Sequence, residues 1–506
     1  MNPSRAATSE SILTTTAGTG IEGLDRVLNG GFNRNQTLLI EGETGSGKTT
    51  LALQFILEGV RRGERVLYFT LSESSQELKA MAVSHGWSLD SVPIRELIAS
   101  PDDLKPDHQY TLFHPSEVEL GETIRVILGE VEATNPARVV FDALSELRLL
   151  AGSPLRYRRQ LLVLKRFFAS RECTVLFLDD RPLNDPDAQL QGIADGVLNL
   201  EQLHPQYGAE RRRLKIVKYR GKEYRGGYHD FAIRRGGLDV FERFLDGENG
   251  DGNGIPFQAL STGIPGIDSL LGGGIARGSS TLISGASGCG KSSFAAQVVV
   301  SAAERGIPGA MFVFDESPHL LMARASGMGI DLRKHVDAGI VSLRSVDPAE
   351  LSPGEFAHIV RREAEQKRGG VLVIDSLNGY LYAMPEERFL TLQLHELLTY
   401  LASRAIASIL IAVQHGMVGA TVIAPVDVSY LADAIVLIRN FEAQGELRQA
   451  ISVLKKRSGH HERTIREFKM TNEGIRVGEP LREFQGIFTG VPFETPEKGR
   501  HHESNG

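Results

Sequence analysis

Cysteine is nearly absent from this sequence of 506 residues, which contains only Cys173 and Cys289. Two cysteines cannot form a disulfide framework, and no Cys-x-x-Cys pair offers zinc ligands. The chain also has no run of about 18 apolar residues, the length that spans a membrane, and residues 1–17 lack the basic-then-apolar pattern of a signal peptide. We therefore expect a protein of the reducing cytoplasm without a membrane partner.

Strong charge of one sign is missing as well. The 56 basic and 63 acidic residues give a net charge of −7, and 41% of the residues are hydrophobic. This balance excludes a disordered chain and a protein that wraps nucleic acid over its whole surface. Glycine is abundant, with 54 residues, which indicates tight turns and phosphate-binding loops.

The sequence contains an internal repeat. The segment Thr-Gly-Ile-Glu-Gly-Leu-Asp at 19–25 returns as Thr-Gly-Ile-Pro-Gly-Ile-Asp at 262–268, and the glycine-rich segment 42–49 returns at 285–292. Both pairs are separated by 243 residues. We therefore predict two homologous domains. The predicted boundaries are a polar segment 1–17, a first domain 18–245, a linker 246–257, a second domain 258–492 and a polar tail 493–506.

Short apolar runs alternate with helix-length amphipathic segments in both repeats, which is typical of parallel βαβ units. Two later segments, 214–219 and 451–456, are followed by hairpin signals and predict antiparallel strands at the sheet edge. The predicted fold class is α/β, with two tandem P-loop NTPase domains, each a mostly parallel twisted sheet flanked by helices. The predicted parallel strands are 36–40, 65–70, 138–141 and 174–178 in the first repeat, and 280–284, 311–314, 371–374 and 408–413 in the second.

Each repeat contains the pattern Gly-x-x-x-x-Gly-Lys-Ser/Thr between a predicted strand and a predicted helix. Such a loop surrounds phosphate with backbone N–H groups, and the helix N-terminus adds partial positive charge. Lys48 and Lys291 would contact the β and γ phosphates of ATP, and the hydroxyls of Thr49 and Ser292 would face Mg²⁺. The other predicted cofactor contacts are Gly45, Ser46, Gly47, Thr50, Gly288, Cys289, Gly290 and Ser293.

Acidic residues follow the predicted strands in matching positions. Asp142 and Asp375 end buried strands, where a carboxylate holds the water shell of Mg²⁺. Glu73 follows another strand, as does the pair Asp315 and Glu316, and these carboxylates are candidate bases that orient the attacking water. Glu316 is also a predicted metal ligand. The alternative that these acids cap a helix remains open.

A Lys-x-Arg pattern recurs near the end of one strand in each repeat, as Lys218 and Arg220 and as Lys455 and Arg457. Residues two apart on a strand project from one face, so both cations can reach one anion. A γ-phosphate would be stabilised by such a pair, particularly when an adjoining subunit supplies it, and Arg220 and Arg457 are therefore candidate catalytic residues. The alternative is a solvated basic edge that limits aggregation.

With these motifs, the chain resembles tandem KaiC-like ATPases of the RecA-like class. The ending Phe-Gln-Gly-Ile-Phe-Thr-Gly-Val-Pro at 484–492 adds to the resemblance. It implies a circadian-clock type of protein, a double-ring homohexamer with ATP at subunit interfaces, slow hydrolysis, and serine/threonine autophosphorylation by the second ring. The nucleotide contacts that the resemblance implies are Ser84, Lys218, Tyr219, Arg220, Lys455, Lys456, Arg457 and His461.

The chain departs from this family in three places. Asp315 is one methylene shorter than the glutamate that serves as the autophosphorylation base, and the acceptor pair aligns with Ser429 and Tyr430, so Ser429 is the predicted phosphoacceptor. The first repeat keeps one acid, Glu73, after Ser72. The tail after Pro492 is short, so we expect no KaiA-type partner; a KaiB-like or response-regulator/kinase partner is the expected one.

Two other functions remain open, namely a RecA-like nucleic-acid motor or recombinase and a scaffold that ATP only holds together. Arginines at 156, 158, 159 and 211–213 would contact nucleic acid, but an exposed, ion-paired face is the favoured interpretation and we expect no nucleic-acid partner. For Cys289 a small packed side chain is favoured over a redox role. The histidine pairs 460–461 and 501–502 are interpreted as solvated rather than metal-binding.

Overall fold

The computed structural model describes residues 16–97, 115–180, 189–205, 208–244, 258–382, 390–414, 429–487 and 493–494. The chain divides into two compact units, Met1–Arg243 and Phe244–Gly506. Phe244 packs in the second unit, where its ring stacks on Tyr400. The predicted linker, His501, His502 and Pro492 lie outside the described residues.

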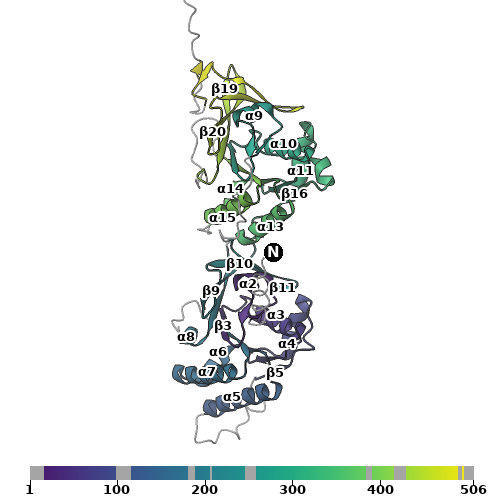
Figure 1. Ribbon diagram of the computed structural model, residues 1–506. Helices are drawn as coiled ribbons and strands as arrows, with labels where there is room; N and C mark the ends of the chain where they lie inside the picture. Colours follow the sequence, from purple (N-terminus) through teal and green to yellow (C-terminus); the bar gives the residue numbers. More distant parts are fainter. Residues whose placement is uncertain are drawn as a thin grey trace, which may run out of the picture. The chain divides into compact units, whose positions relative to one another are not determined.

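Unit 1 is built on a nine-stranded sheet in the order β11-β10-β9-β8-β3-β7-β6-β4-β5 (Figure 1). The strand before the glycine loop, β3 (Thr37–Gly42), lies between two parallel neighbours, β7 (Thr174–Asp180) and β8 (Gly196–Leu203). The last three strands join β8 in antiparallel order, as the hairpin signals predict. The other strands are β1 (Thr16–Ala17), β2 (Phe32–Asn33), β4 (Val66–Thr70), β5 (Ile94–Glu96), β6 (Arg138–Asp142), β9 (Arg211–Tyr219), β10 (Tyr228–Arg234) and β11 (Gly237–Phe241). The helices are α2 (Glu22–Val27), α3 (Lys48–Arg61), α4 (Ser75–His85), α5 (Pro115–Thr134), α6 (Leu144–Ala151), α7 (Pro154–Ala169) and α8 (Gln189–Ile193).

Unit 2 repeats this architecture in the order β16-β15-β17-β18-β14-β19-β20-β21-β22. Its central strand β14 (Ser280–Gly285) again has two parallel neighbours, β18 (Ala407–Val413) and β19 (Ala434–Ala443). The structure confirms the predicted fold class of two mostly parallel sheets with antiparallel edge strands. The other strands are β12 (Ala259–Leu260), β13 (Ile275–Ala276), β15 (Gly309–Val313), β16 (Val341–Ser345), β17 (Val371–Asp375), β20 (Glu446–Lys456), β21 (Arg466–Thr471), β22 (Gly474–Pro480), β23 (Phe484–Gln485) and β24 (Phe493–Glu494). The helices are α9 (Pro265–Leu270), α10 (Lys291–Glu304), α11 (Pro318–Gly327), α12 (Leu332–Asp337), α13 (Pro353–Gln366), α14 (Leu377–Tyr382) and α15 (Leu390–Ser403).

The central strands are buried on both faces, which is why they read as continuous apolar runs. Along β3, Leu38 and Ile40 face one hydrophobic cluster, which also contains the buried face of α3. Leu39, which points the opposite way, belongs to a second cluster with residues of α5, α6 and α7. Two packed layers therefore hold β3, and with it the loop at its end, in a fixed position.

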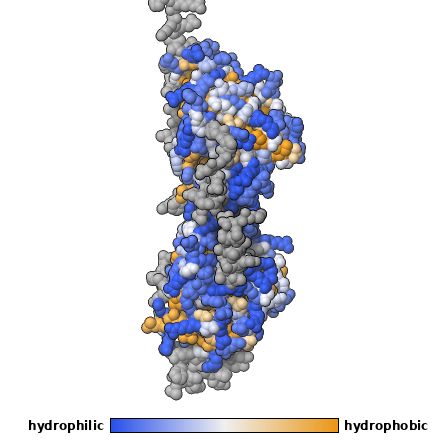
Figure 2. Space-filling model, viewed as in Figure 1, coloured by the Kyte–Doolittle hydropathy of each residue, from blue (hydrophilic) through white to orange (hydrophobic). Residues whose placement is uncertain are grey.

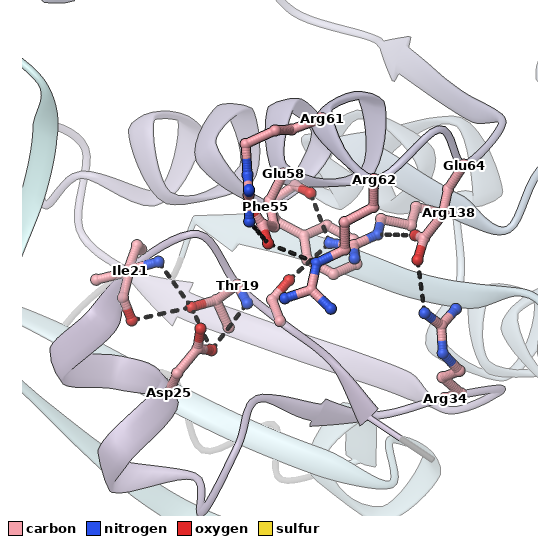
Figure 3. A network of polar contacts seen from close by, with 11 residues as sticks. Thr19, Ile21, Asp25, Arg34, Phe55, Glu58, Arg61, Arg62, Glu64 and Arg138 are labelled. Carbon is pink, nitrogen blue, oxygen red and sulfur yellow. Dashed lines mark hydrogen bonds and ion pairs between the residues drawn. The ribbon is translucent and has the colours of Figure 1, made fainter. Parts of the chain in front are cut away.

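A hydrogen-bonded turn opens each repeat, and Figure 3 shows the one in unit 1. Asp25 accepts hydrogen bonds at 2.8 Å from both the backbone N–H and the hydroxyl of Thr19. Thr262 and Asp268 make the same two contacts in unit 2, at 2.7 and 2.8 Å. These recurring residues fix a turn before the first helix of each unit, so their role is structural.

Unit 1 contains a buried arginine, Arg138, which has no counterpart at the equivalent position of unit 2; Figure 3 shows its surroundings. Arg138, at the start of β6, is fully buried, and its Nε lies 2.5 Å from Glu64. Its guanidinium also donates to the carbonyl oxygens of Gly18 and Phe55, at 2.7 and 2.8 Å. Strand register places Val371 at the equivalent position of unit 2.

Candidate functional site

Both glycine loops lead from the carboxyl end of a central strand into a long helix. The helices α3 and α10 begin at Lys48 and Lys291, directly after Gly47 (φ 102°) and Gly290 (φ 93°). These left-handed angles favour glycine. Neither helix start is capped by a side chain, so the backbone N–H groups of the first turn are available to an anion.

The two loop lysines are folded back over their loops. The Nζ atom of Lys48 donates to the carbonyl oxygens of Gly42 and Glu43, at 2.9 and 2.8 Å, and lies 2.7 Å from Asp180 Oδ1. In unit 2 the Nζ atom of Lys291 donates to the Ala286 carbonyl oxygen at 2.7 Å. Burial lowers the pKa of Lys291. An anion at either loop would supply a stronger partner than these carbonyl oxygens.

The structure brings the predicted metal-binding residues together. In unit 1 the Thr49 hydroxyl donates to Asp142 Oδ2 at 2.8 Å, and the hydroxyl of Tyr68 donates to the same oxygen at 2.7 Å. Burial raises the pKa of Asp142 despite these hydrogen bonds.

The equivalent carboxylate of unit 2 has one unused oxygen. Burial raises the pKa of Asp375 to about 6, although a hydrogen bond from Ser292 opposes the rise. Asp375 Oδ2 is buried and has no hydrogen-bond partner among the described residues. A hydroxyl beside a buried carboxylate with a free oxygen is the donor set that Mg²⁺ takes in nucleotide sites, so the residues present fit that ion.

The candidate bases lie just before two capped helices. Ser74 is the N-cap of α4, where it forms a capping box with Glu77, and Ser317 is the N-cap of α11. The alternative that Glu73 and Glu316 are themselves helix caps is therefore wrong.

These two carboxylates differ in their surroundings. Burial, reinforced by the charge of Asp142, raises the pKa of Glu73, and its Oε2 atom has no hydrogen-bond partner among the described residues. Glu316 instead accepts two hydrogen bonds from Arg324, at 2.7 and 2.6 Å. Beside it, Asp315 accepts a short hydrogen bond from the Ser376 hydroxyl.

In unit 2 these groups surround one cavity of about 450 Å³. Its walls come from the glycine loop, the first turn of α10, the ends of β15 and β17, and α11. The polar side chains that line it include Lys291, Ser292, Asp315, Glu316, Arg324 and Asp375. The cavity thus collects the predicted phosphate-binding, metal-binding and base residues of the second repeat in one place.

The Lys-x-Arg pairs lie at the end of each sheet that is opposite the glycine loop, where the parallel strands begin. Tyr219 is paired with Gly196 at the start of β8, whereas Gly42 is paired with Leu200, four residues further along that strand. Four strand residues span about 13 Å. Unit 2 has the same register, with Lys456 opposite Ala434 and Gly285 opposite Ile438. Within one unit these cations therefore do not reach the loop.

Each Lys-x-Arg pair contacts the chain segment that precedes the adjacent strand, which is β8 in unit 1 and β19 in unit 2. Lys218 donates to the carbonyl oxygens of Gln191 and Ala194, and Arg220 donates to that of Gly192. In unit 2 the Nζ atom of Lys455 lies 3.1 Å from the carbonyl oxygen of Ser429, and Arg457 donates to that of Tyr430. The half-buried Ser429 therefore lies beside the cationic pair, at the edge opposite its own loop.

Four other predicted contacts are placed as follows. Ser84 is exposed on α4, and its hydroxyl donates to the carbonyl oxygen of Met81. The hydroxyl of the buried Tyr219 accepts from the Asn33 backbone, and Lys456 donates to the carbonyl oxygen of Leu271. Burial lowers the pKa of the half-buried His461. The side chains of Tyr219 and Lys456 are thus engaged within their own units.

The remaining predictions concern Cys289 and metal binding. Cys289 is fully buried in the loop of unit 2, and burial raises the pKa of its thiol. A neutral buried thiol is a weak nucleophile, which supports the packing role. Among the described residues, no group of three or more His, Cys, Asp and Glu side chains is placed to hold a metal ion. Within the same residues, no helix has both the length and the apolar character of a membrane span.

The arginine-rich segments give the nucleic-acid interpretation little support. Arg212 and Arg213 are paired with Glu210 and Glu201, each at 2.8 Å. Exposed apolar side chains interrupt the basic face of α7, and Figure 2 shows hydrophobic surface at the lower left, where Figure 1 places this helix. The exposed apolar residues of α6 and α7 are Leu149, Leu155, Leu162 and Val163.

Several residues of the site were missed by the sequence analysis. Asp180 becomes a neighbour of Lys48 only because β7 lies beside β3. Asp179, one residue earlier, is buried and lies 2.5 Å from Arg148. The acidic pair directly after a predicted buried strand was the available signal. For Arg324, eight residues beyond Glu316, the sequence offered no comparable signal.

Comparison with known proteins agrees with this geometry. The family model described as the KaiC ATPase matches residues 17–244 and again residues 260–482. Circadian clock protein KaiC3 of Synechocystis sp. is 25% identical over 489 residues, which cover 95% of each chain. Circadian clock oscillator protein KaiC of Thermostichus vulcanus is 26% identical over 482 residues, covering 94% of this chain and 91% of the relative. Each matched range contains a glycine loop, an aspartate that ends β6 or β17, and a Lys-x-Arg pair, and the chain therefore belongs to the KaiC family of ATPases, with the family domain present twice.

Proposed function

We propose that this ATP-binding protein is an Mg²⁺-dependent ATPase that works as a ring, a homohexamer in which each nucleotide lies between two subunits. In each site one subunit provides the glycine loop, the hydroxyl and the acids, and the next subunit provides the Lys-x-Arg pair. The observation that carries the proposal is the placement of these cations at the end of the sheet opposite their own loop. A neighbouring copy in head-to-tail contact brings its Lys-x-Arg pair to the glycine loop of the first copy, and such contacts close into rings.

The chemistry at each interface follows from the residues present. Lys48 and Lys291 hold the phosphates, while Thr49 with Asp142 and Ser292 with Asp375 hold Mg²⁺, which neutralises phosphate charge when bound. Glu73 is suited to orient the attacking water, since its raised pKa lies closer to neutral pH. Arg220 and Arg457 stabilise the charge that moves onto the leaving oxygen.

We further propose that unit 2 phosphorylates Ser429 across the interface. The serine lies at the same edge as Lys455 and Arg457, so the arrangement that brings these cations to a neighbour's γ-phosphate brings the serine hydroxyl as well. Asp315 would accept the hydroxyl proton during in-line attack. A KaiB-like or response-regulator/kinase partner would then read the phosphorylated state.

A complementation experiment tests the shared site. One variant carries Glu73→Gln and Glu316→Gln and lacks both glutamate bases. The other carries Arg220→Ala and Arg457→Ala and lacks the arginine of both Lys-x-Arg pairs. Each alone should release little phosphate. In an equal mixture that assembles at random, roughly a quarter of the interfaces combine an intact glutamate from one subunit with an intact arginine from the next, and activity should reappear. Full activity of the Arg220→Ala/Arg457→Ala chain by itself would contradict the shared site.

Two further measurements separate the alternatives. Equilibrium sedimentation with saturating Mg-ATP should show the hexamer. Incubation with γ-labelled ATP, followed by mass spectrometry of residues 425–434, should place label on Ser429 that disappears in Lys291→Ala. Assembly without phosphate release would indicate the nucleotide-held scaffold, and strong stimulation by single-stranded DNA would indicate the nucleic-acid motor.

A further inference from the structure

The two candidate bases occupy equivalent positions but have different neighbours. The spacing of 243 residues that relates Glu73 to Glu316 also relates the helix caps Ser74 and Ser317 that follow them. The same spacing places Met81 of α4 at the position of Arg324 of α11. At the position where α11 carries the arginine that contacts Glu316, α4 therefore carries a methionine, which packs against a core cluster of unit 1.

The contact in unit 2 is bidentate. Arg324 donates through both terminal nitrogens, one to each carboxylate oxygen of Glu316, at 2.7 and 2.6 Å. Both side chains line the cavity that also contains Lys291 and Asp375. A carboxylate whose two oxygens both accept from a guanidinium is fixed in orientation, and its oxygens are less available to an attacking water.

Stability alone does not explain this pair. The Arg324 side chain is 44% exposed and that of Glu316 is 19% exposed, and ion pairs this close to solvent contribute little to folding. In unit 1, the oxygen Oε2 of Glu73 is buried and has no hydrogen-bond partner among the described residues, so no equivalent clamp holds it.

We propose that Arg324 is a positioning residue that clamps Glu316 and slows ATP hydrolysis in unit 2, so that unit 2 retains ATP longer than unit 1. The inference rests on the proposed ATPase function. It assigns different rates of ATP hydrolysis to the two units. Unit 1, which has Met81 at this position, hydrolyses ATP faster, and unit 2, in which Arg324 holds Glu316, hydrolyses it more slowly. A slow site keeps a γ-phosphate available for transfer to a hydroxyl instead of water.

The test uses the full chain with Glu73→Gln, which silences hydrolysis by unit 1. In this background Arg324→Met, which copies the residue of unit 1, should raise kcat for phosphate release by about two- to fivefold with little change in KM, as expected for loss of a weak ion pair. Arg324→Lys keeps the charge but not the bidentate contact and should give a smaller rise. Adding Glu316→Gln should abolish the gain, because the gain depends on that carboxylate.

The reciprocal variant provides a matched control. In a Glu316→Gln background, Met81→Arg should slow phosphate release by unit 1. If Arg324→Met leaves kcat unchanged or lowers it while the parent chain is active, the clamp is refuted and the ATPase function stands. If neither the wild-type chain nor any variant releases phosphate, the proposed function fails, and the clamp with it. Thermal melting of each variant identifies a rate change that arises from misfolding.

Discussion

Asp179 provides a sharp test of the electrostatics of unit 1. It lies near the end of β7, 2% exposed, with Arg148 at 2.5 Å as its ionic partner. Burial nevertheless raises the pKa of its carboxyl to about 6, and the charges of Glu41 and Asp180 add to the rise. A raised pKa means that the folded state binds this proton more tightly than the unfolded state.

The magnitude follows from the pKa difference. An unfolded aspartate titrates near pH 3.9, roughly two pH units lower, and each unit corresponds to about 1.4 kcal/mol, so the carboxyl accounts for about 3 kcal/mol. This stability is fully present below about pH 4 and is lost as the pH rises through about 6. Between pH 5 and pH 7.5 the expected loss is roughly 1.4 kcal/mol.

The substitution Asp179→Asn removes the titrating group. Relative to wild type, its free energy of unfolding should therefore improve by about 1.4 kcal/mol between pH 5 and pH 7.5. Urea unfolding can be followed by the fluorescence of Trp87, the single tryptophan of the chain, which packs against a core cluster of unit 1. The exposed substitution Asp90→Asn is the control and should show no such trend. A difference between Asp179→Asn and wild type that stays constant with pH would refute the reasoning.

Three other predictions follow from single contacts. Glu64→Gln leaves the guanidinium of Arg138 buried without its counter-charge, so the free energy of unfolding of unit 1 should fall by about 3 to 5 kcal/mol in the same fluorescence assay; an unchanged value would show that the pair is dispensable. Cys289 should react with a thiol reagent only after denaturant is added, and rapid labelling of the native protein would contradict its burial. In a Lys48→Ala background, Asp375→Asn should remove the Mg²⁺ dependence of nucleotide binding by unit 2 in calorimetry, and a retained dependence would exclude Asp375 as a metal-site residue.

The sequence predicted those parts of the molecule that depend on short-range patterns. A glycine loop between an apolar strand and a helix is a local structure, so the positions of Lys48 and Lys291 follow from their neighbours. Strand-end aspartates such as Asp142 are predictable for the same reason, because parallel strands deliver their carboxyl ends to one edge. The boundaries of the predicted parallel strands moved by at most two residues, as in β15, which begins at Gly309 rather than at 311. The antiparallel strand β20 begins at Glu446, five residues before its predicted start at 451.

What escaped prediction depends on strand order and on the reach of long side chains. The strands β8 and β19, which separate the loop strand from the antiparallel edge, were not anticipated, and they set the distance between each loop and its Lys-x-Arg pair. The proximity of Asp180 to Lys48 requires knowing that β7 is the neighbour of β3. The contact between Arg324 and Glu316 depends on how a flexible side chain folds back over a helix start, which residue spacing does not specify.

The threonine–aspartate turn at the start of each repeat indicates the fold of a chain separately from its catalytic activity. The hydrogen bonds between Thr19 and Asp25, and between Thr262 and Asp268, complete a backbone turn and involve no residue of the glycine loops. Selection for a stable fold alone would preserve them, even in a descendant whose bases had mutated away. The presence of these turns in a chain therefore speaks for the fold and not for ATP hydrolysis.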